Sequence, residues 1–298
     1  MVTQNLLNSS NIVVKNQMGG FQVLEYAKDM SVSTYTSRMN YFMSKMNVQK
    51  RQVLLNLNGN SFTVQAGAMQ WISGQVQMNS GVTGVGNFFK KMAQATVTGE
   101  TVSKPVYTGY GQVMLEPTYR HIILTDLAEW GGSVVLDDGL FLACDSTIQH
   151  QVVSRANLSS AVFGGEGLFN LCLNGQGVAA LESIVPREEI YEFVLDNDVL
   201  KIDGNMAIAW SSTLDFTVEK SSKSLVGSAI AKEGLVNVYR GSGKVWMAPV
   251  LMTGGSAGKS SVANSGNTAS GGQTGSAAAR NDAVSKLEKF GKFMDKFS

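Results

Sequence analysis

A Gly-x-Gly motif recurs in the sequence at a constant spacing of 66 residues. It opens the stretches GYGQVMLEP, GQGVAALES and GSGKVWMAP, whose glycines are Gly109 and Gly111, Gly175 and Gly177, and Gly241 and Gly243. A phosphate-binding loop has no reason to recur at a fixed period, whereas a repeated supersecondary unit does. A dinucleotide-binding fingerprint also requires a strand before the motif, a helix after it and a third glycine, and none of the three sites has these. We therefore interpret the six glycines as structural positions in tight turns or bulges where the chain enters a strand.

The sequence around these motifs repeats with them and is typical of β-structure. A glycine follows a β-type stretch in each copy, at Gly67, Gly139 and Gly204. Before each glycine lie β-rich runs around turn residues, in 52–64, 121–136 and 189–202. The sequence predicts an all-β fold with a sandwich- or barrel-like body. This body consists of three repeated β units of about 66 residues, at about 50–118, 119–184 and 185–250.

The composition divides the chain into four parts. We predict an N-terminal extension over 1–20, the triplicated body over 21–250, a flexible Gly/Ser/Ala-rich linker over 251–280 and a helix over 281–298. The linker has a root-mean-square reach of about 30 Å. At 100° per residue, the helix gathers its large apolar residues on one side, namely Val284, Leu287, Phe290, Phe293, Met294 and Phe297. Such an amphipathic helix binds a membrane surface, a protein partner or a groove on its own body.

Charge and cysteine content exclude several classes of protein. The net charge is only +1, which disfavours a dedicated nucleic-acid-binding protein. Charged residues make up 16% of the chain, and this low share suits a β protein that covers surface by self-association. Two cysteines do not indicate a disulfide scaffold, and the sequence has no apolar run long enough to span a bilayer. We expect a cytoplasmic protein that attaches peripherally to a membrane.

Several stretches together resemble a known family. VQAGAM (64–69), DDGLFLACDSTIQ (137–149) and GGEGLFNLCLNGQGVAAL (164–181) are similar to the Altered Inheritance of Mitochondria protein twenty-four family, over about residues 21–250. The resemblance implies an all-β body of the kind grouped with the tryptophan RNA-binding attenuation protein, often in symmetric oligomers. Mitochondrial members of the family are linked to the organisation of inner-membrane cristae. The resemblance supplies no catalytic residues.

One segment departs from the family pattern and is interpreted as an insertion. In residues 30–51, large apolar side chains fall on one face of a short helix, at Tyr35, Met39, Phe42, Met43 and Met46. We expect this helix to cap the open end of the β body. The alternative is a methionine-lined binding surface.

No constellation of residues in the sequence predicts catalysis. Cys144 and His150 lie in one short stretch, and a Cys-His pair is a potential nucleophile and base. If the stretch is one continuous strand, the two lie roughly 20 Å apart, too far for a hydrogen bond. Cys172 alternates with polar neighbours as a strand residue does, and His121 begins an apolar run. We therefore predict no catalytic, cofactor-binding or metal site, because a zinc site needs about four closely spaced Cys or His ligands.

The sequence thus favours a non-enzymatic oligomeric scaffold or interaction protein. A homotrimer is the first expectation, with the C-terminal helix binding an anionic membrane surface or a partner. The alternative is a module that binds a small ligand or RNA in clefts between the β units. Nucleic acid is the less expected partner because the chain is nearly neutral.

Overall fold

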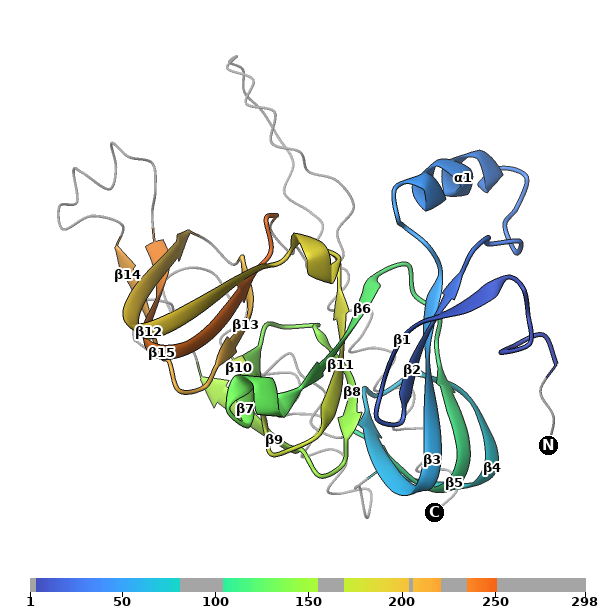
Figure 1. Ribbon diagram of the computed structural model, residues 1–298, viewed down its shortest axis with the longest axis horizontal. Coiled ribbons are helices and arrows are strands. Elements are labelled where there is room, and N and C mark those ends of the chain that lie inside the picture. The colour runs from blue at the N-terminus through green and yellow to red at the C-terminus, as the bar shows by residue number, and fades with distance from the viewer. Residues whose placement is uncertain (1–3, 81–103, 155–168, 204–205, 221–234, 251–298) are drawn as a thin grey trace, which may run out of the picture. The chain divides into compact units, whose positions relative to one another are not determined.

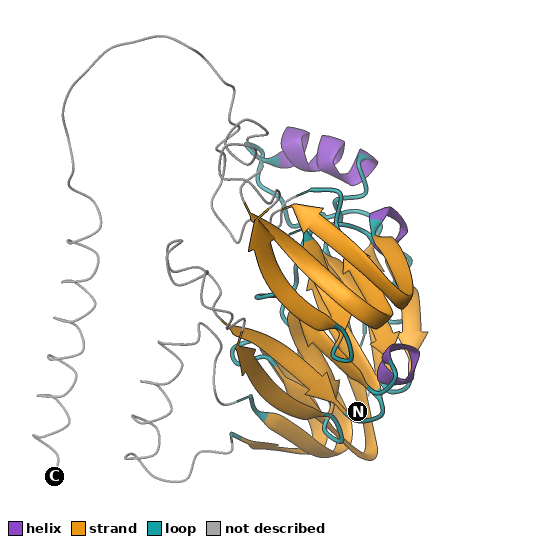
Figure 2. Ribbon diagram, turned by 90° about the vertical axis from the view of Figure 1, so that its left-hand side faces the viewer, coloured by secondary structure: helices purple, strands orange, loops and turns teal. Residues whose placement is uncertain are grey.

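The computed structural model describes residues 4–80, 104–154, 169–203, 206–220 and 235–250. All of the described residues belong to one structural unit, residues 1–254. The predicted linker and C-terminal helix, with the six apolar residues of that helix, therefore lie outside the described residues. Most of the described chain is strand, with little helix, as Figures 1 and 2 show. The predicted all-β class is confirmed.

The strands form two antiparallel sheets with a barrel-like curvature. The eight-stranded first sheet contains β1 (Ile12–Met18), β2 (Phe21–Tyr26), β3 (Arg51–Val64), β4 (Met69–Asn79), β5 (Val106–Leu115), β6 (His121–Asp126), β8 (Phe141–Asp145) and β11 (Val178–Ser183). Its order is β1-β2-β3-β8-β11-β6, and β5 pairs with both β3 and β4. Because β6 and β1 end this order, both are edge strands.

The second sheet has seven strands. They are β7 (Ser133–Leu136), β9 (Gln149–Ser154), β10 (Phe169–Asn174), β12 (Tyr191–Asp203), β13 (Ala207–Ser211), β14 (Asp215–Lys220) and β15 (Leu235–Met247). Their order is β12-β15-β13-β7-β10-β9, and β14 pairs with β15. The described helices are α1 (Ser37–Lys45) and the 3-10 helices η1 (Leu127–Trp130) and η3 (Arg187–Glu189).

The central strands are buried on both faces, which explains their nearly continuous apolar runs. In β7, Val134 and Leu136 point into a core between the two sheets, whereas Val135 points into a second core on the opposite face. The core between the sheets contains Trp130 and Trp246, whose rings meet edge to face with centroids 4.8 Å apart. The indole nitrogen of Trp130 donates to the Thr125 hydroxyl at 2.9 Å. The two sheets therefore share one packed interior.

The N-terminal residues belong to the sheet rather than extending from it. β1 pairs with β2, and β2 pairs with β3. Leu6 packs with Leu24, Leu54 and Met114 in a separate core cluster on the outer face of this sheet. The boundary expected at residue 21 falls inside this β-hairpin.

The repeated glycines occupy special backbone positions. Five of the six have positive φ, namely Gly109 (126°), Gly111 (151°), Gly175 (132°), Gly177 (134°) and Gly241 (113°). Gly109 and Gly111 lie inside β5, where the backbone of β4 passes so closely that a Cβ atom on Gly109 would be 2.1 Å from the Gln75 carbonyl oxygen. Gly175 and Gly177 lie between β10 and β11, and Gly241 lies in β15 beside an irregular register with β12. Irregular registers of this kind bend a sheet, which accounts for the curvature.

Candidate functional site

The structure brings Cys144 and His150 into contact, so the separation of roughly 20 Å predicted for a continuous strand is wrong. The Cys144 sulfur lies 3.2 Å from Nε2 of His150. The chain turns after Asp145, where the Ile148 amide donates to the Asp145 carbonyl at 3.1 Å. β8 before this turn belongs to the first sheet and β9 after it to the second, so the chain changes sheets at this corner. Both side chains consequently point toward the same interior.

The environment of this pair keeps both groups neutral. Burial raises the pKa of the Cys144 thiol well above its usual range, and the neighbouring Asp145 carboxyl adds to that increase. Burial lowers the pKa of His150 to about 4, with a smaller contribution from the Lys104 ammonium. A nucleophilic cysteine requires a thiolate and an accessible sulfur, whereas Cys144 is fully buried. The contact is therefore a packing and hydrogen-bonding feature rather than an activated nucleophile.

The lowered pKa of His150 predicts a pH dependence of stability. An unfolded histidine has a pKa of about 6.5, whereas folded His150 has a pKa of about 4. Between these values the unfolded state binds more protons, so the free energy of unfolding falls as the pH decreases from about 6.5 to about 4. We expect His150→Leu to flatten this decrease in urea unfolding measured across that pH range. His121 remains in both proteins, so equal slopes for the two would contradict the assignment.

A polar cleft of about 250 Å³ lies among β1, β2, β6 and η3. Its charged and titratable lining residues include Lys15, Glu25, Arg51, His121, Glu129 and Glu188. Arg51 is buried and donates to Glu25 at 2.8 Å, to the Asn47 carbonyl and side-chain oxygens at 3.0 Å, and to the Gln49 and Arg120 carbonyls at 3.4 Å. Lys15 also approaches Glu25, at 3.5 Å.

Arg51 and Lys15 both pair with Glu25 in this polar cleft. Because Arg51 uses its donors within the protein, it links β3 to β2 and to the loops at Asn47 and Arg120, and it is not available for an anionic ligand. Burial and the Arg51 charge lower the pKa of His121, so that imidazole is neutral near pH 7. Among the described residues, no group of three or more His, Cys, Asp or Glu side chains is placed to hold a metal ion.

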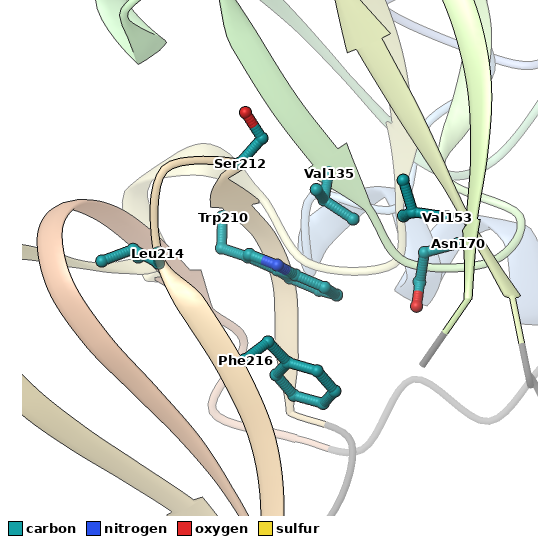
Figure 3. A pocket seen from close by; sticks show the side chains of 7 residues that line it. All are labelled: Val135, Val153, Asn170, Trp210, Ser212, Leu214 and Phe216. Atoms are coloured by element: carbon teal, nitrogen blue, oxygen red, sulfur yellow. The ribbon is translucent and has the colours of Figure 1, made fainter. Parts of the chain in front are cut away.

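A second, mostly apolar pocket of about 180 Å³ opens between β7, β9 and β10 on one side and β13 and β14 on the other. Figure 3 shows Trp210 and Phe216 forming one wall, with Val135, Val153 and Asn170 opposite. The two rings stack with centroids 5.6 Å apart. A third, open hollow lies over the β4–β5 backbone at Gly74 and Gly109, and its lining contains no titratable residue. Ligand sites usually measure about 300–1,000 Å³, so the Trp210 pocket is small for one.

The most distinctive surface of the described chain is on α1. The helix has no buried residue. Five exposed large apolar side chains belong to α1 or lie directly beside it, and we call them the α1 surface: Tyr35, Met39, Tyr41, Phe42 and Met46. Tyr35 is 96% exposed and Met46 is 77% exposed. The expectation that this helix caps the β body is wrong, because it buries none of its residues against the strands.

The fold and these sites define an all-β protein whose outstanding surface feature is an uncovered apolar helix. The chain belongs to the mitochondrial biogenesis AIM24 family, whose model matches residues 43–250, and this confirms the resemblance read from the sequence. It is 30% identical over 200 residues to an uncharacterized protein of Streptococcus pyogenes serotype M6, covering 64% of this chain and 77% of that protein. A crystal structure of a Streptococcus pyogenes protein is similar, with a TM-score of 0.51 and 26% identity over 69% of this chain and 90% of the other. Most of α1 precedes the matched range.

Sequence reasoning missed the structural role of Arg51 and the wall formed by Trp210 and Phe216. Nothing in the local sequence shows that Arg51 is buried, because its partners come from β2 and from two loops. Trp210 and Phe216 are six residues apart, the same separation as Cys144 and His150, and each pair spans a turn between two strands. This shared six-residue spacing across a turn is the sequence signal that could have predicted that the two residues of each pair lie close together.

Proposed function

We propose that this protein is a non-enzymatic scaffold that self-associates and attaches to an anionic membrane surface through two amphipathic segments, the α1 surface and residues 281–298. The α1 surface carries the proposal. Three of the four large apolar side chains of α1 are exposed. Each of them loses a burial energy of roughly 1.5–3 kcal/mol. Exposed apolar patches of this kind mark interaction sites. No helix among the described residues is long and apolar enough to cross a membrane.

The charges around α1 favour an anionic surface as its partner. Residues 30–51 contain four basic residues and no acidic residue. Lys50 pairs with Asp29 at 3.0 Å and Arg51 pairs with Glu25, so Arg38 and Lys45 are the basic residues of this segment that make no ion pair among the described residues. Both belong to α1 and lie along one side of its apolar face, next to Phe42. Aromatic and methionine side chains between basic residues are typical of helices that lie in the membrane interface.

Co-sedimentation with liposomes tests this proposal. We expect the full-length protein to sediment with vesicles that contain phosphatidylglycerol and to remain in the supernatant with neutral vesicles. Met39→Asp with Phe42→Asp places two charges in the apolar face and is expected to reduce the bound fraction several-fold. A chain that ends at Val250, and the full chain with Phe290→Asp and Phe293→Asp, should also bind less, since several weak helices on one oligomer act together.

The matched control is Ser37→Asp with Ser44→Asp. It adds the same two charges to α1, but at 100° per residue these positions lie opposite Met39 and Phe42, on the side of the helix that carries Tyr41. We expect this control to retain most of the binding lost by the Met39 and Phe42 variant. Equal binding by the wild type and all variants would refute the membrane role. If the control loses as much binding as the Met39 and Phe42 variant, the added negative charge and not the apolar face explains the loss.

We propose that self-association rests on three related β units, with a trimer as the first expectation. The pairing of the strands supports the units. β4 pairs with β5, β8 and β9 pair with β11 and β10, and β13 and β14 pair with β15, which is the pattern expected of three related units. A closed ring of identical subunits covers open sheet edges that would otherwise aggregate.

Binding of a small ligand or RNA between the β units is the less supported function. The Trp210 pocket lies between strands of the second and third units, but its volume is about 180 Å³. In the polar cleft, the Arg51 guanidinium is already occupied by Glu25 and Asn47. A net charge of +1 gives RNA little electrostatic attraction. The exposed helix therefore supports the scaffold better than the pockets support a ligand-binding protein.

A further inference from the structure

Two long strands have one unpaired edge each. β12 pairs with β15 from Tyr191 to Asp203, and β4 pairs with β5 from Met69 to Asn79. Among the described strands, nothing pairs with the other edge of either one. β4 contains no charged residue and no proline over its 11 residues. Natural edge strands are usually protected by such residues, so the edge of β4 is one that a partner strand is expected to cover. β12 differs in containing five charged residues.

The strand pairs inside the chain indicate which kind of strand pairs with such an edge. β3 pairs with β8 on the side away from β5, and β7 pairs with β13 on the side away from β10. In both cases the first strand of one unit pairs with the second strand of the next unit. β12 is the first strand of the last unit, and β4 is the second strand of the first unit. β12 and β4 are therefore the one first strand and the one second strand that have no such partner within the chain. They do not pair with each other and lie far apart in Figure 1.

The register of the two complete pairs is the same, counted from the Gly-x-Gly motifs. Thr63 lies between Val106 and Cys144, and Val135 lies between Cys172 and Trp210. Val106, Cys172 and Val238 each stand three residues before the motif of their unit, and Val238 pairs with Lys201. Lys201 is therefore the residue in β12 that corresponds to Thr63 and Val135.

The second strands follow the same count. Cys144 pairs with Ala179 and Trp210 pairs with Val245, each two residues after a motif. Val113 stands two residues after the first motif and pairs with Ile72. Ile72 is therefore the residue in β4 that corresponds to Cys144 and Trp210, and its side chain is 37% exposed.

We infer that β12 of one copy pairs antiparallel with β4 of a second copy, with Lys201 opposite Ile72. This inference rests on the proposed self-association and specifies its interface. The contact joins two different edges, so each copy offers one edge to each neighbour, which generates a ring if the rotation closes. Ile202 then lies opposite Trp71, and Leu200 lies opposite Ser73. The partner is a second copy because the pairing continues the order already present inside the chain.

Cross-linking tests the register in the full-length protein. Directly opposite residues in an antiparallel pair have Cβ atoms about 4.5–5.5 Å apart, and adjacent residues point to opposite faces. Lys201→Cys with Ile72→Cys should give covalent multimers with a short thiol cross-linker. The matched control, Lys201→Cys with Ser73→Cys, should give at least ten-fold less. Native Cys144 and Cys172 are buried and should not react in the folded protein.

A charge exchange provides the second test, read by light scattering. Ile72→Lys places two lysines opposite each other and should raise the dissociation constant of the oligomer at least ten-fold. Adding Lys201→Glu should restore it, which a misfolded variant would not do. A monomeric wild type would refute the self-association itself. An oligomeric wild type whose mass is insensitive to both exchanges, with no register-specific cross-link, would overturn only the pairing of β12 with β4.

Discussion

Gly109→Ala is expected to lower the free energy of unfolding by about 3 kcal/mol or more. Gly109 has a φ of 126°, and an added Cβ atom would lie 2.1 Å from the Gln75 carbonyl oxygen, 3.2 Å from the Gln75 carbonyl carbon and 3.3 Å from the Val76 Cα atom. All three are backbone atoms of β4, so no side chain can rotate away. Overpacking costs roughly 1–3 kcal/mol and a strained φ adds about 1–3 kcal/mol.

Gly67→Ala is the matched control for this substitution. Gly67 also has a positive φ, of 84°, but an added Cβ atom would meet nothing within 4 Å. We expect it to cost about 1–2 kcal/mol, the strain of the left-handed conformation alone. Urea unfolding followed by circular dichroism measures both. Similar losses of unfolding free energy in the two variants would show that the close approach of β4 is not the reason that position 109 needs glycine.

Arg51→Leu is expected to lower the free energy of unfolding by about 3–5 kcal/mol. Removing one member of a buried ion pair has this magnitude because the other charge loses its buried partner. Glu25 would keep only the exposed Lys15. The Arg51 side chain is 4% exposed and its partner Glu25 is 12% exposed. The substitution also removes the N–H groups that donate hydrogen bonds to the Asn47 and Arg120 carbonyl oxygens. Because these partners join β2, β3 and two loops, the loss should appear in global unfolding.

Lys15→Leu tests whether the effect of Arg51→Leu comes from burial or from charge, because Lys15 pairs with the same Glu25 carboxylate. Lys15 approaches Glu25 at 3.5 Å, but its side chain is 60% exposed. Exposed ion pairs contribute about 0–1 kcal/mol, so this variant should be nearly as stable as the wild type, and more so at high salt. If Lys15→Leu destabilises the protein as much as Arg51→Leu, the net charge around Glu25 matters more than the burial of Arg51.

The repeated glycines and the short β-rich apolar runs were sufficient to predict the fold class. Val134, Val135 and Leu136 form one continuous apolar run, and the structure buries them in two cores on opposite faces. Such runs and glycine positions are properties of the local sequence, because backbone conformation and side-chain alternation act within a few residues. The family is also legible in the sequence, since its model matches the stretches that carry the resemblance.

Contacts that depend on where the chain changes sheets were not predictable. Cys144 and His150 meet because the turn after Asp145 passes the chain from the first sheet to the second. A two-residue period describes a strand but not the corner at its end, so the distance predicted from that period was too long. The same limit explains why burial, and with it the shifted pKa values of both groups, required the structure.

The helix in residues 30–51 shows the same division between local and tertiary information. Its apolar face follows from the spacing of Met39, Phe42 and Met46, because a helix places residues three and four apart on one side. Whether that face is covered depends on the distance between α1 and the strands, which no local pattern encodes. Sequence alone determined the β class, the special glycines and the amphipathic face. Only the tertiary structure decided that Arg51 is buried and that the α1 surface is exposed, because burial is set by residues distant in the chain.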